Sequence, residues 1–577
     1  MANRLSGSPS RSSGLVHNAQ LFTCPFFSRG QVKLAMPRSA NSDMRVAARM
    51  LAVLVIAATF TARSSAAYTY TSPRSFRWRS LRNTHQAPAR QGPGTASHEA
   101  FKRIAENTRA RIGADEAAHQ LASGQLLDWG IGGSRLARDD PAGNIDEPLP
   151  ALRTTAVRAV ALSGHTLAVL SDGTVVTFGR NNSAGGGGQG SQPIDDSGQL
   201  GRGDSFDWWR KDFPRNEGPG PVALGRAPAV GVAAGRYHSA AVDAHGKVYT
   251  WGLNDHGQLG RAGVSDTPEG ATPRDGFKFG ETITTVHGRS GGDGIRCVVG
   301  FGCRSGNPAP VELPEDFRAI GISAARYSAV AWDVAGVAYV WGQDGCAGAV
   351  SDESQAHIPR KLPLPPTESG DGYAKIDSGY SHWVALTQNG AIVACHTGYD
   401  GYGSKLERFQ EHQGINWRAV AAATPGSDVF TPQRVLGLER CVDVAAGRGQ
   451  SWAACGGEAL FWGHLPSKVL CERAGDSNAV ETHETSEPCV ARLPPASHAA
   501  LVTMVAAGEY FALIYDDANR RVMSLGANGV GQGGNGAAVK PEVATPVAGR
   551  LGAGGYTVRR LAAGYQHAAA IVKDTRK

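Results

Sequence analysis

Residues 232–260 have the sequence VAAGRYHSAAVDAHGKVYTWGLNDHGQLG, and this stretch decides the fold. Small residues open it, and a short apolar run follows at residues 239–242. His245-Gly246 then supplies a tight turn in which glycine allows a positive φ. The return run at residues 247–251 alternates in polarity before a loop punctuated by glycine. The stretch therefore predicts a β-hairpin followed by a loop.

The same pattern occurs seven times, which indicates a repeat architecture rather than several unrelated domains. The other copies begin near Val160, Ile322, Ile376, Val444, Val505 and Leu561. Turn dipeptides stand at the expected places, Asp172-Gly173, Asn389-Gly390 and Gly456-Gly457. The closing aromatic is Phe178, Trp251, Trp341 or Trp462, and two copies have Cys395 and Leu525 instead. The 75 glycines fit a protein with many tight turns.

The two ends of the chain carry complementary parts of one copy. In the complete copies the closing aromatic follows the histidine position by thirteen residues, as Trp251 follows His238. The last copy has His567 and no aromatic after it, whereas residues 125–130 carry Trp129 with no copy before it. We expect residues 125–130 to pair with residues 561–574, which closes a ring and removes exposed sheet edges.

The full pattern resembles the repeat of the regulator of chromosome condensation family, in seven copies over roughly residues 124–577. The resemblance implies an all-β fold, a seven-bladed propeller of four-stranded blades in which N- and C-terminal strands share one blade. Family members include an exchange factor for the nuclear GTPase Ran, mitochondrial proteins tied to assembly or fusion, and regulators that bind GTPases or other proteins.

The resemblance also implies a non-catalytic scaffold or regulator that binds proteins. The organelle-like leader and the irregular insertions resemble organellar members more than the Ran exchange factor, so the expected partner is a small GTPase or an assembling mitochondrial complex. The alternative is a guanine-nucleotide exchange factor for a small GTPase.

Residues 1–90 contain thirteen Lys or Arg and one acidic residue, Asp43, a composition typical of organelle targeting peptides. Residues 50–60, MLAVLVIAATF, are shorter than the roughly 20 residues of a membrane span but suit a signal-peptide core. The mitochondrion is the favoured address. A plastid or secretory route through an internal signal peptide stays open, as does membrane association through residues 50–60.

The domain prediction is a disordered targeting leader at 1–83, a linker and short helix at 84–123, and the propeller at 124–577. Outside residues 1–90 the chain has 45 basic and 50 acidic residues, a net charge of −5. This balance argues against a dedicated nucleic-acid-binding protein, which needs a basic face to neutralise phosphates.

Nine cysteines, an odd number at irregular spacings, predict that most are reduced thiols and that several pack as small apolar residues. A labile Cys297–Cys303 disulfide is the alternative. Four copies carry a histidine at one position, and this regular placement predicts a shared hydrogen-bonding role in each hairpin; these residues are His165, His238, His382 and His567. No metal, cofactor or catalytic residue is expected, since no such motif occurs in the sequence.

The insertions between copies are the candidate partner-binding sites. Residues 183–222 contain Trp208, Trp209 and Arg210, and exposed Trp and Arg are typical interface anchors. In the alternative interpretation, both Trp side chains fold back onto the propeller. The long insertion at residues 261–318 adds Lys278, Arg289 and Arg296. Residues 464–500 are expected to form a polar, solvated loop.

Overall fold

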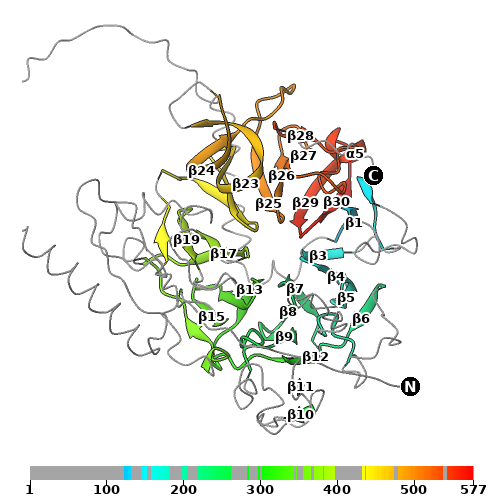
Figure 1. Cartoon of the computed structure of the whole chain (residues 1–577), viewed down its shortest axis with the longest axis vertical. Helices are drawn as coiled ribbons and strands as arrows, with labels where there is room; N and C mark the ends of the chain where they lie inside the picture. The colour runs from blue at the N-terminus through cyan, green and yellow to red at the C-terminus, as the bar shows by residue number, and fades with distance from the viewer. Residues whose placement is uncertain are drawn as a thin grey trace, which may run out of the picture. The chain divides into compact units, whose positions relative to one another are not determined.

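The computed structural model describes residues 123–575 except 132–143, 153–156, 182–197, 204–217, 226, 262–281, 285–295, 299–301, 344–345, 347–354, 366–369, 381, 397–431, 436, 474–478 and 537–541. All the described residues lie in one compact unit, Gln91–Lys577. Their strands form seven antiparallel sheets arranged around a central axis, each sheet one blade (Figure 1). The prediction of an all-β seven-bladed propeller is confirmed.

The blades are numbered in chain order. Blade 1 comprises β3 (Val157–Leu162), β4 (His165–Leu170), β5 (Val175–Gly179) and β6 (Gly220–Val222). Blade 2 comprises β7 (Ala229–Ala234), β8 (His238–Asp243), β9 (Val248–Leu253) and β12 (Gly302–Pro310), extended by β11 (Arg296–Val298) and β10 (Thr282–Thr284). Blade 3 comprises β13 (Ala319–Ala324), β14 (Ser328–Asp333), β15 (Ala338–Gly342) and β16 (Arg360–Lys361).

The remaining blades follow the same order from the axis outward. Blade 4 comprises β17 (Tyr373–Ser378), β18 (His382–Thr387), β19 (Ile392–His396) and β20 (Gln433–Arg434). Blade 5 comprises β21 (Cys441–Ala446), β22 (Gln450–Cys455), β23 (Glu458–Arg473) and β24 (Ala479–Ala491). Blade 6 comprises β25 (Val502–Ala507), β26 (Phe511–Asp516), β27 (Arg521–Gly526) and β28 (Thr545–Pro546), followed by the short helix α5 (Gly549–Gly552).

Blade 7 is built from both ends of the propeller. It comprises β29 (Tyr556–Ala563), β30 (His567–Asp574), β1 (Gln125–Gly130) and β2 (Ile145–Pro150). β1 and β30 are antiparallel, and their register places Trp129 opposite Ala568 and Gly130 opposite His567. The predicted closure is confirmed, and β2 adds a further N-terminal strand outside β1.

The turn between the second and third strands of a blade lies at one end of the propeller, and glycine is required there. Gly173, Gly246 and Gly390 all have φ between 76° and 86°, which confirms the predicted turns. A Cβ on Gly246 would lie 2.8 Å from the Cα of Arg318, so only glycine fits this turn.

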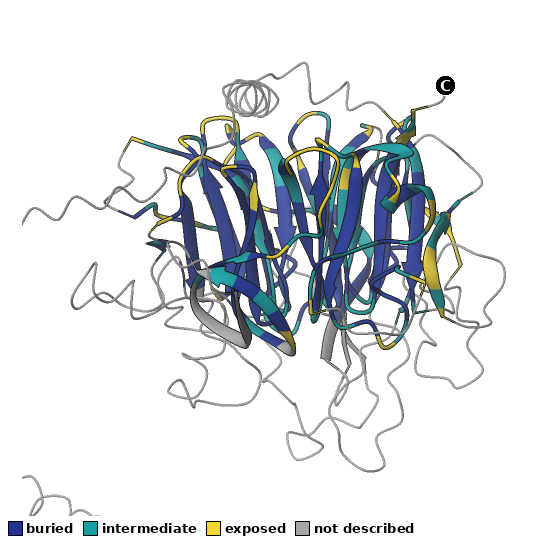
Figure 2. Cartoon of the chain, turned by 90° about the horizontal axis from the view of Figure 1, so that it is seen from above, coloured by how far each residue is buried: buried dark blue, intermediate teal, exposed yellow. Residues whose placement is uncertain are grey.

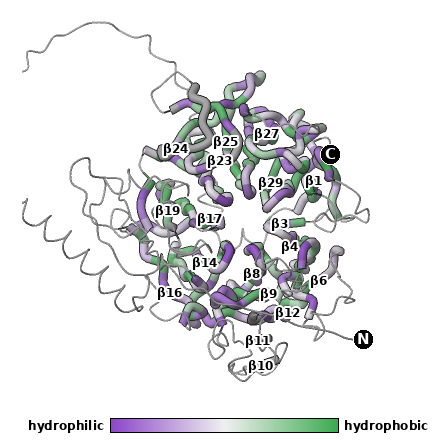
Figure 3. Tube along the Cα trace, in the orientation of Figure 1, coloured by the Kyte–Doolittle hydropathy of each residue, from purple (hydrophilic) through white to green (hydrophobic). Residues whose placement is uncertain are grey.

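The strands are largely buried (Figure 2). The core lies between neighbouring blades, as where Phe511 and Leu513 of blade 6 cluster with Leu127 and Trp129 of blade 7. Hydrophilic segments of several blades lie near the central axis instead (Figure 3). In three blades the closing tryptophan donates its indole N–H to a glutamine carbonyl of the preceding blade, with N···O distances of 3.0, 2.9 and 3.0 Å, in the pairs Trp129–Gln532, Trp251–Gln199 and Trp341–Gln258. The glutamine loop between the third and fourth strands of one blade thus clamps the next blade.

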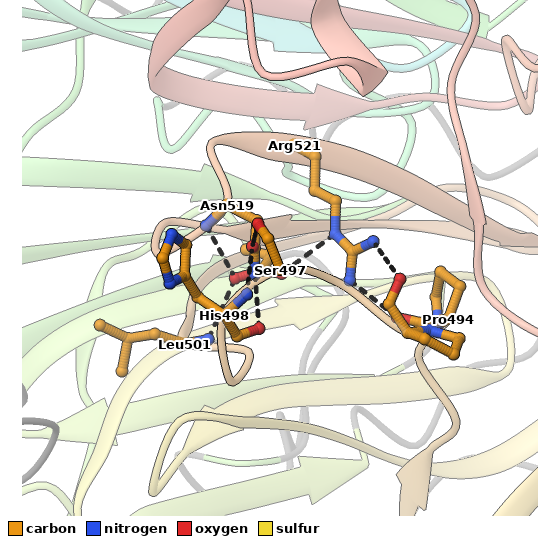
Figure 4. A network of polar contacts seen from close by, with 8 residues as sticks. Pro494, Ser497, His498, Leu501, Asn519 and Arg521 are labelled. Atoms are coloured by element: carbon orange, nitrogen blue, oxygen red, sulfur yellow. Dashed lines mark hydrogen bonds and ion pairs between the residues drawn. The ribbon is translucent and has the colours of Figure 1, made fainter.

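The link from blade 5 to blade 6 is fastened to the turn of blade 6 by the polar network in Figure 4. Arg521 donates to the carbonyl of Pro494 at 2.8 Å and to the buried carboxylate of Asp516 at 3.1 Å. Asn519 donates to the carbonyl of His498 at 3.1 Å. This end of the blade is held by local side-chain bonds to backbone and does not face the axis pocket described below.

The expectation of reduced cysteines is wrong for six of them. Disulfides join three pairs, Cys346–Cys395, Cys441–Cys455 and Cys471–Cys489. Cys441 and Cys455 are register partners on β21 and β22, a relation that irregular spacing in the sequence did not reveal. Cys297 and Cys303 are register partners on β11 and β12, and a disulfide between them stays a prediction.

The expectation of a solvated loop at residues 464–500 is wrong for residues 464–491, whereas residues 492–500 lie outside the strands and are largely exposed, as expected. β23 and β24 run on as a long hairpin, and its Cys471–Cys489 disulfide is buried with Met523 and Leu525 of blade 6. Cys395 has a comparable role. It occupies the register position of the closing tryptophan in blade 4 and is bonded to Cys346 in the loop between β15 and β16 of blade 3.

The predicted leader, linker and helix, residues 1–122, lie outside the described residues. Within the part of the chain that the structure does describe, no helix is long and apolar enough to cross a membrane.

Candidate functional site

A hollow of about 460 Å³, which includes the part open to solvent, lies on the axis where the innermost strands end. All seven blades line it, and we call it the axial pocket. In blades 2 to 7 one aligned position, the residue after the small Gly or Ala that follows the inner strand, contributes a polar side chain. These six residues are Arg236, Arg326, Tyr380, Arg448, Glu509 and Tyr565.

Backbone hydrogen bonds from blade to blade fix this ring. The N–H of the aligned residue donates to a carbonyl of the next blade at 3.1–3.3 Å, in the pairs Arg236–Ala325, Tyr380–Gly447, Glu509–Gly564 and Tyr565–Ser163. Glycine permits the close approach, since a Cβ on Gly379 would lie 2.2 Å from the carbonyl oxygen of Gly447. The side chains therefore project from a rigid backbone ring rather than from free loops.

Three guanidinium groups surround the ring of Tyr380. The Cζ atoms of Arg236, Arg326 and Arg448 lie 5.1, 4.5 and 5.1 Å from its centroid, distances at which cation–π attraction acts. Arg236 also donates a hydrogen bond to the Tyr380 hydroxyl. Burial raises the pKa of Tyr380, although the nearby arginines oppose this, so the phenol stays neutral at physiological pH.

One carboxylate already sits in the cluster. Glu509 Oε1 accepts from Nη1 of Arg448 at 2.5 Å, and the Glu509 side chain is only 10% exposed. The six aligned side chains thus carry three positive charges and one negative charge, because both tyrosines are neutral. The pocket has a positive excess although the chain outside its leader is mildly acidic.

Tyr565 adds a hydrogen-bond donor to the pocket wall. Its hydroxyl oxygen is buried and, within the described residues, has no hydrogen-bond partner. Burial raises the pKa of Tyr565, so the hydroxyl keeps its proton. A buried donor without a partner is costly, and an acceptor atom entering the pocket would satisfy it. The arrangement as a whole can bind an anion.

Comparisons with known proteins agree with this architecture. Two family models with the description "Regulator of chromosome condensation (RCC1) repeat" match residues 229–258 and 245–279, which lie in blade 2 and its insertion. Residues 229–279 of this seven-bladed propeller therefore carry regulator of chromosome condensation repeats. The chain is 26% identical over 332 residues to human E3 ubiquitin-protein ligase HERC2, a match that covers 56% of this chain but 6% of that protein.

Other relatives are similar over more of their length. Ultraviolet-B receptor UVR8 of Arabidopsis thaliana is 26% identical over 355 residues, or 57% of this chain and 67% of the receptor. The Arabidopsis RCC1 domain-containing protein RUG3, mitochondrial, is 29% identical over 153 residues, 25% of this chain and 29% of that protein.

Solved structures show the same fold at low sequence identity. Human WBSCR16 superposes with a TM-score of 0.53 at 16% identity, covering 78% of this chain and all of that one. Prp20p of Saccharomyces cerevisiae gives a TM-score of 0.53 at 16% identity, with coverage of 80% and 95%.

The histidines of the regulator of chromosome condensation repeats join blades rather than strands of one hairpin. Three of them are hydrogen-bonded to a Ser or Thr of the next blade at 2.7–3.1 Å, in the pairs His165–Ser239, His382–Ser451 and His567–Thr166. Burial lowers the pKa of both His165 and His238 to about 3, so these rings are neutral in the folded protein. Among the described residues no three or more His, Cys, Asp or Glu side chains gather as a metal site.

The side chains predicted to bind partners are not part of the axial pocket as described. Trp208, Trp209, Arg210, Lys278 and Arg289 lie outside the described residues, and Arg296 lies in β11. Their roles stay predictions. The sequence analysis missed the pocket residues. Aligning the repeats would have shown three arginines at one position, two residues before the histidine position.

Proposed function

We propose that this chain is a non-catalytic protein-interaction platform and that the axial pocket lies in its working surface. The observation that carries the proposal is the convergence of six aligned polar side chains, one from each of blades 2 to 7, on one hollow. Arg and Tyr are the residue types enriched at binding hot spots. Prp20p, a propeller of the same fold, has binding properties toward Gsp1p and histones, which supports a protein-binding role for such propellers.

The partner class is the finer part of the proposal. A small GTPase or an assembling organellar complex is the expected partner, and exchange activity toward a GTPase is the alternative. The ligase activity in the name of HERC2 is not proposed, because the match covers 6% of that protein. A nucleotide-release assay on the captured GTPase separates the two: acceleration by the purified chain supports exchange, and binding without acceleration supports a scaffold.

The compartment is proposed to be an organelle reached through the leader. The name of RUG3 supports the mitochondrion. Three disulfides with buried cysteines favour the alternative, a secretory route, because such bonds form and persist in oxidising compartments. Residues 1–60 fused to a fluorescent protein should direct import, and alkylation of the cellular protein should find six protected cysteines. A diffuse cytosolic signal would contradict the proposal, and fully reduced cysteines would contradict the secretory alternative.

Proximity labelling with the full-length protein tests the working surface. The variant Arg236→Gln/Arg326→Gln/Arg448→Gln should lose most labelled partners. Arg318→Gln is the matched control, since this exposed arginine lies beside the Gly246 turn at the other end of its blade. If the triple variant folds and labels the same partners as the parent, the axial pocket is not the working surface.

A further inference from the structure

We propose that the axial pocket binds an acidic peptide segment, with a carboxylate side chain of the partner inserted among the arginines. The proposal rests on the proposed function and names the chemistry that a partner must present. It is carried by charge, by an unsatisfied donor and by the nature of the pocket wall.

The charge argument starts from the cluster itself. Arg236, Arg326 and Arg448 are fixed around one tyrosine ring, and Glu509 supplies a single carboxylate to the group. Like charges held close together repel, and an anion entering between them removes that repulsion. The positive excess therefore favours a ligand that brings one or two negative charges.

Geometry favours a carboxylate. Guanidinium groups can bind carboxylates through planar paired N–H donors, and one guanidinium–carboxylate hydrogen bond, from Arg448 to Glu509, already forms in the pocket. Tyr565 offers a further donor, since its buried hydroxyl has no hydrogen-bond partner in the part of the chain that is described. The aligned tyrosine rings and guanidinium groups can therefore hold one carboxylate from more than one side.

The pocket wall favours a side chain over a free ion. Between the charged groups it is lined by small apolar residues, Ala234, Ala324, Ala446, Ala507 and Ala563. Such a wall suits the methylene stem of Glu or Asp, whereas a fully hydrated phosphate ion gains nothing from it. The occupant is therefore an extended acidic segment that reaches the axis, with its backbone outside the pocket.

Fluorescence anisotropy with the purified chain tests the inference. The probe is a fluorescein-labelled octapeptide of alternating Glu and Gly, and the control probe has Gln in place of Glu. We expect the Glu peptide to bind at least tenfold more tightly than the Gln peptide, and its affinity to fall as NaCl rises from 50 to 300 mM.

Variants with opposite expected signs separate binding from misfolding. Arg326→Gln should weaken the Glu peptide at least tenfold, because it removes a positive charge from the pocket. Glu509→Gln should tighten it severalfold, because it removes the internal carboxylate that competes for Arg448. Tyr565→Phe should weaken it severalfold, and Arg318→Gln should leave it unchanged. Matching thermal melts confirm that each variant is folded.

Equal binding of the two peptides overturns the inference, as does equal weakening by Arg326→Gln and Arg318→Gln. Displacement of the Glu peptide by inorganic phosphate at the concentration at which free glutamate displaces it would show a general anion site, and also overturns it. If the protein still captures partners, any of these results contradicts only the acidic-peptide inference and not the proposed interaction platform. If the parent protein captures no partner, the proposed function is wrong.

Discussion

Blades 7, 1, 2 and 3 and blades 4, 5 and 6 join to their neighbours in different ways. In the first group, the clamped half, the indole N–H groups of Trp129, Trp251 and Trp341 bond to glutamine loops of the preceding blade. We call the second group the cross-linked half, because each of the described disulfides involves at least one cysteine from these blades. In blade 4 of this half, Cys395 stands in the place of the closing tryptophan.

The difference shows that neighbouring blades can be connected by different residues, provided that a connection is made. Where the repeat keeps its Gln-x-Gly loop and tryptophan, one hydrogen bond and a buried indole connect the blades. At the joint between blades 3 and 4, where Cys395 replaces the tryptophan, a covalent bond to Cys346 connects the two blades, while the other two described disulfides lie within blade 5. A disulfide stabilises mainly by restricting the unfolded chain, so it can replace a joint without copying its contacts.

The largest effect is expected from removing residues 556–577. β30 pairs with β1 over six residues, and Ala568, Ala570 and Ile571 are fully buried. Their loss opens the clamped half and exposes the edge of β1. The cost should be several kcal/mol or more against a typical total of about 5–15 kcal/mol. The truncated chain should aggregate or melt far below the parent in calorimetry and light scattering.

A chain ending at Thr575 is the matched control, because it keeps the whole of β30. It should melt with the parent. If the chain lacking residues 556–577 stays monomeric with an unchanged melting temperature, ring closure does not hold the clamped half together.

A smaller effect is expected from the double variant Cys346→Ala/Cys395→Ala, which removes the covalent joint between the halves. The bond closes a segment of 49 residues, so its loss should lower the free energy of unfolding by about 2–4 kcal/mol. Chemical denaturation measures this value. The pair Cys441–Cys455 spans 14 residues, and its removal should cost about 1 kcal/mol less. An equal or larger loss there would contradict the loop-closure account.

The clamped half was predictable from the sequence because its copies keep a fixed spacing. The thirteen residues from His238 to Trp251 gave the strand register, and the same offset gave the pairing of residues 125–130 with the last copy. The disulfides were not predictable, because they depend on which decayed positions the ring places side by side. Cys346 and Cys395 share no motif and become neighbours only through the stacking of blade 4 on blade 3.

The candidate site was missed for a related reason. Sequence reasoning looked for binding residues in the insertions, where Trp208 and Arg210 stand out. The axial pocket is instead made by one position of each repeat, and its residues vary among Arg, Tyr and Glu. Their common function appears only when a ring brings that position from several blades to one axis.

Acid should loosen blades 1 and 2, whereas reductant should loosen blades 4 and 5. His165 and His238 are buried with pKa values lowered to about 3, so they bind protons on unfolding and stability is complete above their unfolded value of 6.5. Stability should fall by about 1.4 kcal/mol per pH unit for each ring between pH 6.5 and pH 3. Blades 5 and 6 have Gln450 and Phe511 at this position.

Hydrogen exchange therefore should show blades 1 and 2 opening first at pH 5, and blades 4 and 5 opening first under reductant at pH 7. The variant His238→Gln copies Gln450 of blade 5. It should take up about one proton fewer on unfolding, which is measured as a smaller slope of the unfolding free energy against pH. The same order of opening under both conditions would show that the two halves are not held differently.

A finer test compares two fully buried tryptophans. Trp341 donates to the carbonyl of Gln258 at 3.0 Å, whereas the indole nitrogen of Trp462 has no hydrogen-bond partner within the described residues. Both changes to Phe remove similar ring volume. Trp341→Phe should therefore cost about 1–2 kcal/mol more than Trp462→Phe in the free energy of unfolding, because it leaves a buried carbonyl unpaired. Equal costs would mean that the clamp acts through packing alone.

The smallest expected effect has the opposite sign. His165, His382 and His567 each bond to the hydroxyl of the residue that follows the histidine position in the next blade. For His238 that residue is Ala329, and within the described part of the chain neither ring nitrogen of His238 has a hydrogen-bond partner. Ala329→Ser supplies the missing hydroxyl and should raise the free energy of unfolding by about 0.5–1.5 kcal/mol.

Ala568→Ser is the matched control, because the preceding blade offers Phe511, which cannot form a hydrogen bond. A buried serine there should destabilise the protein. If both substitutions destabilise equally, the hydroxyl does not pair with His238, and the histidine joint is not a transferable feature of the ring.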